Sequence, residues 1–369
     1  MKDLYIGLMS GTSADGIDAA LVDFSGTQPV VMETHYSPYP QTLREKILAL
    51  SQKGEDEIQR LGELDIILGK AFAQTANHLL QKQSFSASSI KAIGSHGQTI
   101  RHHPPRFTIQ IGDPNTIAVE TGITTVADFR RKDIALGGQG APLVPAFHQY
   151  LFASNDKNRV IVNIGGMSNI TLLPKQYEGP IIGFDPGPGN VLMDAWIHLH
   201  RKELHDKEGA WGAQGKVEST LLANMLTDPY FHLSPPKSTG REYFNLEWLK
   251  KQLQEKKFSP VNVQTTLVEL TAQSIIHACT QSMNHGEMLI CGGGAYNTFL
   301  MSRLRELAKP HFTVDSTQKY GIAPNWIEAI AFAWLARQTL LGKPGNLPSV
   351  TGARLSSVLG GVYYSSNSR

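Results

Sequence analysis

The chain contains the same short pattern twice, and this repetition limits its fold more than any other feature. An apolar run at 4–9 predicts a strand, SGTSADG at 10–16 predicts a turn, and 17–24 predict a second strand. A buried run at 159–164 leads in the same way into GGMSNIT, which predicts a second hairpin of the same chemical type. Two such hairpins, each beginning a domain, are typical of an internally duplicated α/β fold that holds a nucleotide between its halves.

The first turn has a composition that suits phosphate. Its backbone N–H groups and the hydroxyls of Ser10, Thr12 and Ser13 match phosphate oxygens. Ordinary hairpin loops are built from similar residues, so this turn alone does not separate a phosphate site from a plain connection. The second turn, at Gly165 and Gly166, is the observation that favours phosphate binding.

A carboxylate follows the next apolar run. Residues 181–184 predict a short strand that ends at Asp185, PGPG predicts a rigid turn, and Asn190 is placed to cap a helix from Val191. Asp185 could also do no more than cap that turn, as aspartate before proline often does. Partial burial beside the proline-rich loop would make its carboxylate more basic.

Polar residues also follow two predicted strands in the first half of the chain. A strand at 90–95 leads to His96, and a later strand leads to the charged residues 128–131, which predict a binding mouth or a solvated surface loop. His96, His102 and His103 invite a metal site. Adjacent residues of an extended segment point apart, however, so we favour a hydrogen-bonding role for His96.

Two features of the last third also suggest a site. A strand at 288–290, the glycines at 292–294 and a helix from Thr298 predict a backbone-lined edge that can approach a base or ribose. A long helix at 326–341 carries Glu328 in its first turn, beside small residues. That carboxylate could serve only the helix dipole, and position alone favours this interpretation.

We predict two domains. The first covers 1–140, and the C-terminal segment 345–369 is expected to return to it. The second covers 141–344. The boundary is placed at the glycine-rich sequence LGGQGAP, which opens a predicted helix at 143–151.

Composition excludes several classes of protein. The 369 residues are 41% hydrophobic and 18% charged, and the net charge of +2 comes from interspersed Lys and Arg, so neither nucleic acid nor a membrane is an expected partner. No apolar run is long enough to span a bilayer and the N-terminus has no signal region, so we expect a cytoplasmic protein. Cys279 and Cys291 lie in apolar patterns and are predicted to be reduced core residues.

The motifs taken together resemble one family. LMSGTSADGIDAALVDF, SHGQTIRH, DFRRKDIALGGQGAPLVP, VNIGGMSNIT, GFDPGPGN and LICGGGAYN resemble the anhydro-N-acetylmuramic acid kinases, a branch of the sugar kinase, Hsp70 and actin superfamily. The resemblance extends over nearly the whole chain. It implies a two-lobed actin-like α/β fold with a duplicated core. It also implies use of ATP and Mg²⁺ to open 1,6-anhydro-N-acetylmuramic acid and phosphorylate O6, in peptidoglycan recycling.

The resemblance also implies roles for particular residues. Asp185 would be the general base, and His96, Arg130 and Glu328 would bind the sugar. The nucleotide would be bound by residues of the three glycine-containing turns, namely Gly11, Thr12, Ser13, Ala14, Asp15, Gly16, Ile17, Asp18, Gly165, Gly166, Gly292, Gly293, Gly294 and Asn297. The superfamily usually carries an aspartate shortly before Gly-Thr, where this chain has Met9 and Ser10. The Mg²⁺ ligands are therefore unassigned, and a homodimer is left open.

Physical reasoning agrees with these roles. Phosphoryl transfer needs positioned oxygens, neutralised charge and a base, and the sequence supplies two hydroxyl-bearing turns and Asp185. Arg130 and Arg131 could pair with the lactyl carboxylate of a muramic acid. Two alternatives stay open: a conventional sugar or N-acetylhexosamine kinase, and a non-catalytic ATP-binding switch.

Overall fold

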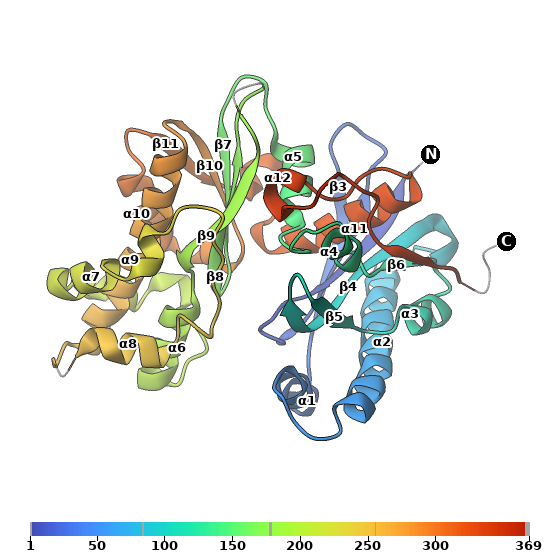
Figure 1. Cartoon of the computed structure of the whole chain (residues 1–369), viewed down its shortest axis with the longest axis horizontal. Coiled ribbons are helices and arrows are strands. Elements are labelled where there is room, and N and C mark those ends of the chain that lie inside the picture. Colours follow the sequence, from blue (N-terminus) through green and yellow to red (C-terminus); the bar gives the residue numbers. More distant parts are fainter. Residues whose placement is uncertain (1, 83–84, 177–178, 255, 366–369) are drawn as a thin grey trace. The chain divides into compact units, whose positions relative to one another are not determined.

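The computed structural model describes residues 2–82, 85–176, 179–254 and 256–365 (Figure 1). The chain forms two compact units, Met1–Leu151 with Trp326–Arg369, and Phe152–Asn325. The structure thus divides the chain elsewhere than at the boundaries 140 and 344. The helix α11 (Ile327–Leu340) belongs to the first unit because it packs on the central strands there. A Cβ atom on Gly7 would lie 1.7 Å from the carbonyl oxygen of Ala329.

A seven-stranded sheet forms the centre of the first unit. Its strands are β1 (Leu4–Ser10), β2 (Gly16–Asp23), β3 (Val30–Pro38), β4 (Ile90–His103), β5 (Phe107–Ile111), β6 (Thr125–Ala127) and β12 (Gly361–Tyr363). They are ordered β12-β6-β4-β1-β2-β3, and β5 pairs with β4. The β1–β2 and β2–β3 pairs are antiparallel, whereas β1–β4 and β4–β6 are parallel.

The second unit repeats this topology. Its strands are β7 (Arg159–Ile164), β8 (Met167–Leu173), β9 (Ile182–Pro188), β10 (Gly286–Cys291) and β11 (Phe312–Ser316), in the order β11-β10-β7-β8-β9. The β7–β8 and β8–β9 pairs are antiparallel, and the β7–β10 and β10–β11 pairs are parallel. The shared order and directions confirm the predicted duplicated α/β core of the actin-like fold.

Helices connect and cover the strands. The first unit holds α1 (Gln41–Ser51), α2 (Glu57–Lys82), α3 (Pro114–Thr121), α4 (Arg131–Ala135), α11 and α12 (Pro348–Thr351), and α5 (Val144–Phe152) ends at the boundary. The second unit holds α6 (Val191–Arg201), α7 (Ser219–Leu226), α8 (Leu246–Leu253), α9 (Pro260–Ser282) and α10 (Thr298–Leu307). Single 3₁₀ turns occur at Ala87–Ser89, Lys207–Gly209, Gly212–Gln214, Pro229–His232, Gly293–Tyr296, Thr317–Tyr320 and Pro324–Trp326. No helix within the described ranges is long and apolar enough to span a bilayer.

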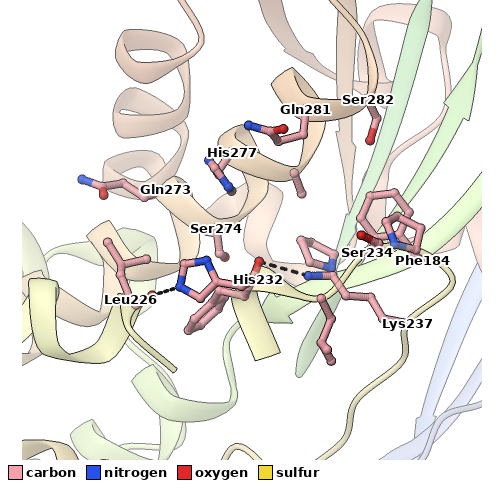
Figure 2. A pocket seen from close by; sticks show the side chains of 15 residues that line it. Phe184, Leu226, His232, Ser234, Lys237, Gln273, Ser274, His277, Gln281 and Ser282 are labelled. Carbon is pink, nitrogen blue, oxygen red and sulfur yellow. Dashed lines mark hydrogen bonds between the residues drawn. The ribbon is translucent and has the colours of Figure 1, made fainter. Parts of the chain in front are cut away.

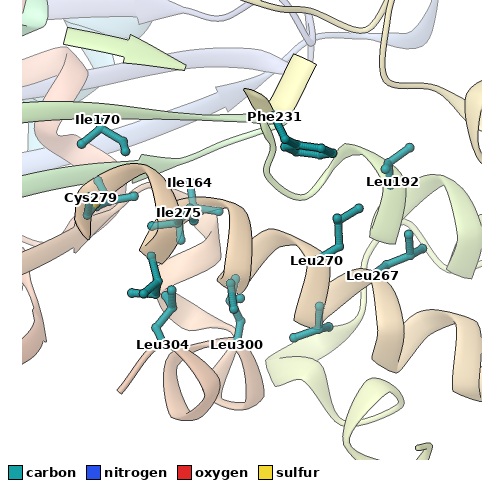
Figure 3. Close-up of a cluster of buried hydrophobic side chains, with 14 of the residues drawn as sticks. Ile164, Ile170, Leu192, Phe231, Leu267, Leu270, Ile275, Cys279, Leu300 and Leu304 are labelled. Carbon is teal, nitrogen blue, oxygen red and sulfur yellow. The ribbon is translucent and has the colours of Figure 1, made fainter. Parts of the chain in front are cut away.

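The helix α9 lies at the centre of the second unit's core. Leu267, Leu270 and Ile275 of this helix are fully buried against apolar side chains of the sheet and of α10 (Figure 3). Cys279 belongs to the same cluster, and Cys291 ends the buried strand β10. Both thiols are therefore core residues, as predicted.

Two strands are longer than the sequence predicts. Strand β4 does not end at Ser95 but continues to His103, because its second half pairs with β5. Strand β9 does not end at Asp185 but runs through Pro-Gly-Pro to Pro188. It lies at the edge of its sheet, where proline is tolerated because one side of the strand needs no N–H donor.

Candidate functional site

The first phosphate-type turn is fixed by side chains of β4 and of the segment after β3. Gln98 donates from Nε2 to the carbonyl oxygen of Gly11 at 3.1 Å, and its Oε1 lies 2.7 Å from Ser10 Oγ. Tyr39 donates to Ser10 Oγ at 3.1 Å. Ser10 is therefore a buried support of the turn, whereas Thr12 is exposed. Sequence reasoning missed Gln98 and Tyr39. The motif SHGQT contained the signal for Gln98, but Tyr39 carried none.

The second turn is bonded to the segment that follows Asp185. Gly189 donates its N–H to the carbonyl oxygen of Gly166 at 2.9 Å, and Asn190 donates its N–H to that of Gly165 at 2.8 Å. The prediction that the Asn190 side chain caps α6 is wrong, since its Nδ2 instead donates to the carbonyl oxygen of Ile164 at 3.1 Å. The second hairpin and the start of α6 thus form one hydrogen-bonded assembly.

The carboxylate of Asp185 is held by a segment far along the chain. Ser238 Oγ and the N–H of Thr239 donate to Asp185 Oδ2 at 2.9 and 3.1 Å. Burial raises the pKa of Asp185, opposed by these two hydrogen bonds and by the positive charge of Lys237. The result is a desolvated, oriented carboxylate that is more basic than an ordinary aspartate, as a general base requires.

A second charged cluster lies within the first unit and joins four of the motifs. Arg130 donates from Nη2 and Nε to His96 Nε2 at 2.8 and 3.1 Å, and from Nη1 to the carbonyl oxygen of Gly140 at 2.8 Å. Burial, together with the carboxylates of Glu328 and Asp15, raises the pKa of Asp18 to about 7. Burial also raises the pKa of Glu328, and the charge of Arg130 opposes this.

His96 occupies a defined place in this cluster. Burial and the positive charge of Arg130 hold the pKa of His96 well below its usual value, so the ring is neutral. Because Nε2 accepts from Arg130, the ring hydrogen resides on Nδ1. Ser95 Oγ is buried and has no hydrogen-bond partner among the described residues. His96 Nδ1 is also buried, and within the described ranges only the backbone of Ser10 and Gly97 interacts with the ring besides Arg130. Ser95 and His96 both line a cavity of about 270 Å³, which can therefore accept a polar ligand.

The two arginines differ in the structure. Arg130 is tied to His96 and Gly140, and its burial lowers its pKa to about 10. Arg131 lines the cavity beside His96, and its guanidinium bonds Asp128, with Nε 2.7 Å from Oδ1. Arg131 is thus the arginine that reaches the cavity, whereas Arg130 orients His96.

The triple glycine is packed more tightly than an open nucleotide edge requires. Gly292 has a φ of 78°, and a Cβ atom there would lie 2.2 Å from Asn163 Oδ1. A Cβ atom on Gly294 would lie 2.4 Å from Ile164 Cγ2, whereas one on Gly293 would meet nothing closer than 3.8 Å. Asn297, predicted to bind the nucleotide, accepts from the N–H of Leu300 at 2.9 Å and so caps α10.

The comparisons with known proteins agree with one another. The sequence matches the family described as Anhydro-N-acetylmuramic acid kinase over residues 3–365. The anhydro-N-acetylmuramic acid kinase of Coxiella burnetii (strain Dugway 5J108-111) is 54% identical over 98% of both chains. The chain belongs to the anhydro-N-acetylmuramic acid kinase family. The predicted family is therefore confirmed.

The chain is also similar to other proteins. The family's protein from Shewanella oneidensis is 54% identical over 98% of this chain and 99% of its own. Among solved structures, an activator of 2-hydroxyisocaproyl-CoA dehydratase from Clostridium difficile matches with a TM-score of 0.48 and 9% identity, covering 90% of this chain and 93% of that chain. Family membership rests on the sequence matches.

Proposed function

We propose that the protein uses ATP to open 1,6-anhydro-N-acetylmuramic acid with water and to phosphorylate O6, giving N-acetylmuramic acid 6-phosphate for peptidoglycan recycling. Membership of the kinase family supports the reaction. The observation that carries the mechanism is the half-buried Asp185 carboxylate, oriented by Ser238 and Thr239.

In this proposal Asp185 is the general base. It takes a proton from a water molecule whose oxygen bonds C1 of the sugar while the C1–O6 bond breaks. O6 then forms the new bond to the γ-phosphorus, and ADP leaves. One carboxylate therefore suffices, because the phosphoryl group neutralises the charge that an acid would neutralise in a glycosidase.

We assign the sugar contacts to the 270 Å³ cavity. His96 Nδ1 and Ser95 Oγ are buried donors that a hydroxyl or carboxylate oxygen of the sugar would satisfy. Arg131 is the proposed partner of the lactyl carboxylate, and it would exchange its contact with Asp128 for that group. Arg130 then acts through His96.

Each hairpin turn, Gly11–Asp18 in the first unit and Gly165–Gly166 in the second, is proposed by itself as a phosphate-binding turn. No group of three or more His, Cys, Asp or Glu within the described ranges could hold a metal ion. Mg²⁺ on ATP needs only one or two carboxylates, because phosphates and waters complete its coordination. Asp18 fits this need, because burial, together with the carboxylates of Glu328 and Asp15, raises its pKa and makes its ionised form costly without a cation. Bound Mg²⁺ would neutralise phosphate charge.

The reaction itself tests the proposal. Protein, ATP and the anhydro sugar are incubated in ¹⁸O-water, and the product is analysed by mass spectrometry. We expect one label on C1, none in the phosphoryl group, and no ring opening without ATP. Label in the phosphate, or ring opening without nucleotide, would contradict the coupled mechanism. Phosphorylation of free N-acetylhexosamines alone would favour the conventional kinase.

A further inference from the structure

A second cavity, of about 550 Å³, lies within the second unit and is not used by the proposed reaction. Three segments line it: β9, residues 226–237 and α9. Figure 2 shows His277 and Gln281 projecting from α9 on one side, with His232 and Lys237 on the other. Its size lies in the range of small-molecule sites.

The lining combines an apolar floor with a polar rim that includes one lysine. Phe184 and Phe231 are buried and belong to the core, so the floor is rigid and apolar. The rim carries amide, hydroxyl and basic side chains: Gln273, Gln281, Ser234, Ser282, His232, His277 and Lys237. No described residue that lines the cavity is acidic. Such a site favours an anion that also carries hydroxyl groups and an apolar face.

Hydrogen bonds and the strand backbone connect the wall of the cavity to Asp185. Alternate residues of a strand point to opposite faces, so Phe184 and Pro186 face the cavity while Asp185 faces away. Asp185 donates its N–H to the carbonyl oxygen of Lys237 at 3.1 Å, and its carbonyl oxygen accepts from Tyr230 at 2.8 Å. Residues of the cavity wall are thus continuous with the donors that hold the Asp185 carboxylate.

An anionic ligand in the cavity would compete with backbone carbonyl groups for the ammonium group of Lys237. Its ammonium group donates to the carbonyl oxygens of Tyr230 and Phe231 at 3.1 and 3.4 Å and lies 4.9 Å from the Tyr230 ring centroid. An anion in the cavity would draw this ammonium group away from those carbonyl groups. Because Ser238 and Thr239 follow Lys237 directly, their bonds to Asp185 would shift with it.

We propose that this cavity is a regulatory site for small anionic sugars, of the chemical class of a sugar phosphate, and that its occupancy changes the position of Asp185. The regulatory half of the proposal rests on the proposed role of Asp185 as the base. The proposal that the cavity binds such sugars does not depend on the role of Asp185.

The test uses N-acetylglucosamine 6-phosphate as the probe, with N-acetylglucosamine and inorganic phosphate as comparisons. Binding is measured by calorimetry, and hydrogen exchange is followed in peptides covering 182–188 and 230–241. We expect the phosphosugar to bind at least about tenfold more tightly than N-acetylglucosamine, because only the phosphosugar carries an anionic group. It should also bind more tightly than inorganic phosphate, because only the phosphosugar has a ring face to place on the apolar floor. Exchange should change in both peptides. Tighter binding of inorganic phosphate than of the phosphosugar would overturn the sugar assignment.

Variants locate the site. His277→Ala with Gln281→Ala removes two exposed rim side chains and should weaken phosphosugar binding at least about tenfold. His205→Ala, an exposed histidine outside the lining, should bind as the wild type does. Equal binding by the double variant, or exchange changes confined to residues 10–18, would overturn the proposal. Unchanged turnover with the phosphosugar bound in the cavity would contradict regulation through Asp185 but not binding of the sugar.

Discussion

At the scale of single residues, Asp185 is fixed by contacts on both its backbone and its carboxylate. Asparagine keeps the shape and can still accept from Ser238 and Thr239, but it cannot take a proton. We expect Asp185→Asn to fold and bind ATP normally and to lower kcat by about two to four orders of magnitude. Steady-state kinetics and a thermal unfolding curve measure the two parts. Turnover above about a tenth of the wild-type value would show that another group is the base.

The pH profile provides an independent check on the same carboxylate. Because a base acts in its ionised form, kcat should fall as the pH drops through the raised pKa of Asp185. Ser238 donates to the ionised form and so lowers this pKa, and Ser238→Ala should raise it further. The acid limb of the profile should therefore move to higher pH. Ser302→Ala, on the exposed side of α10, is the matched control. Coincident profiles for all three proteins would exclude Asp185 as the titrating group.

Kinetics with two different sugars can distinguish the proposed roles of Arg131 and Arg130. Arg131→Ala should raise KM for the anhydro-muramic substrate, by roughly 10- to 100-fold, and should affect the analogue without the lactyl group much less. Arg130→Ala should impair both sugars equally, since it disturbs His96. Steady-state kinetics with the two sugars decide between the arginines. If Arg130→Ala instead affected only the substrate with the lactyl group, Arg130 would be the partner of the lactyl carboxylate.

At the scale of elements, α11 packs closely against β1 at Gly7. An added Cβ on Gly7 would be 1.7 Å from Ala329 O and 2.6 Å from Ala333 N, so Gly7→Ala must push the helix away. We expect the free energy of unfolding to fall by about 1–3 kcal/mol or more. Gly62→Ala in α2 meets no atom within 4 Å and should be stabilising by up to about 1 kcal/mol. Urea unfolding of both variants measures the contrast, and destabilisation by Gly62→Ala would refute the packing argument.

The elements also show what sequence patterns can and cannot predict. The hairpin turn at 10–16, the start of α6 at Val191 and the position of Glu328 in a first turn all follow from local signals. The contact of Ser238 with Asp185 joins residues 53 positions apart, and no local pattern reports it. The sequence predicts too short a strand β9, because prolines normally end a strand. They are tolerated here since β9 lies at the edge of its sheet, and an edge position is a property of the tertiary structure.

At the scale of the whole molecule, the C-terminal segment is tied to the first unit through Asp133. This buried carboxylate accepts from Asn346 Nδ2 at 2.7 Å, Thr351 Oγ1 at 2.8 Å and the N–H of Gly140 at 2.8 Å. Thr351→Val removes one donor, and we expect a loss of about 1–3 kcal/mol in the free energy of unfolding. Thr351→Ser retains the hydroxyl and should stay close to the wild type. Equal stability of the two variants in urea unfolding would show that the bond contributes little.

The return of the chain to its first unit has a consequence for synthesis on the ribosome. Strands β1 and β4 are made early, but α11, which covers them, follows the whole of the second unit. At about 5–20 residues per second, the polymerisation between α5 and α11 takes on the order of 10–35 s. The apolar face of the first sheet therefore stays uncovered during that interval, while the second unit can already close its core. We therefore expect the first unit, rather than the second, to be the part of the nascent chain that chaperones bind.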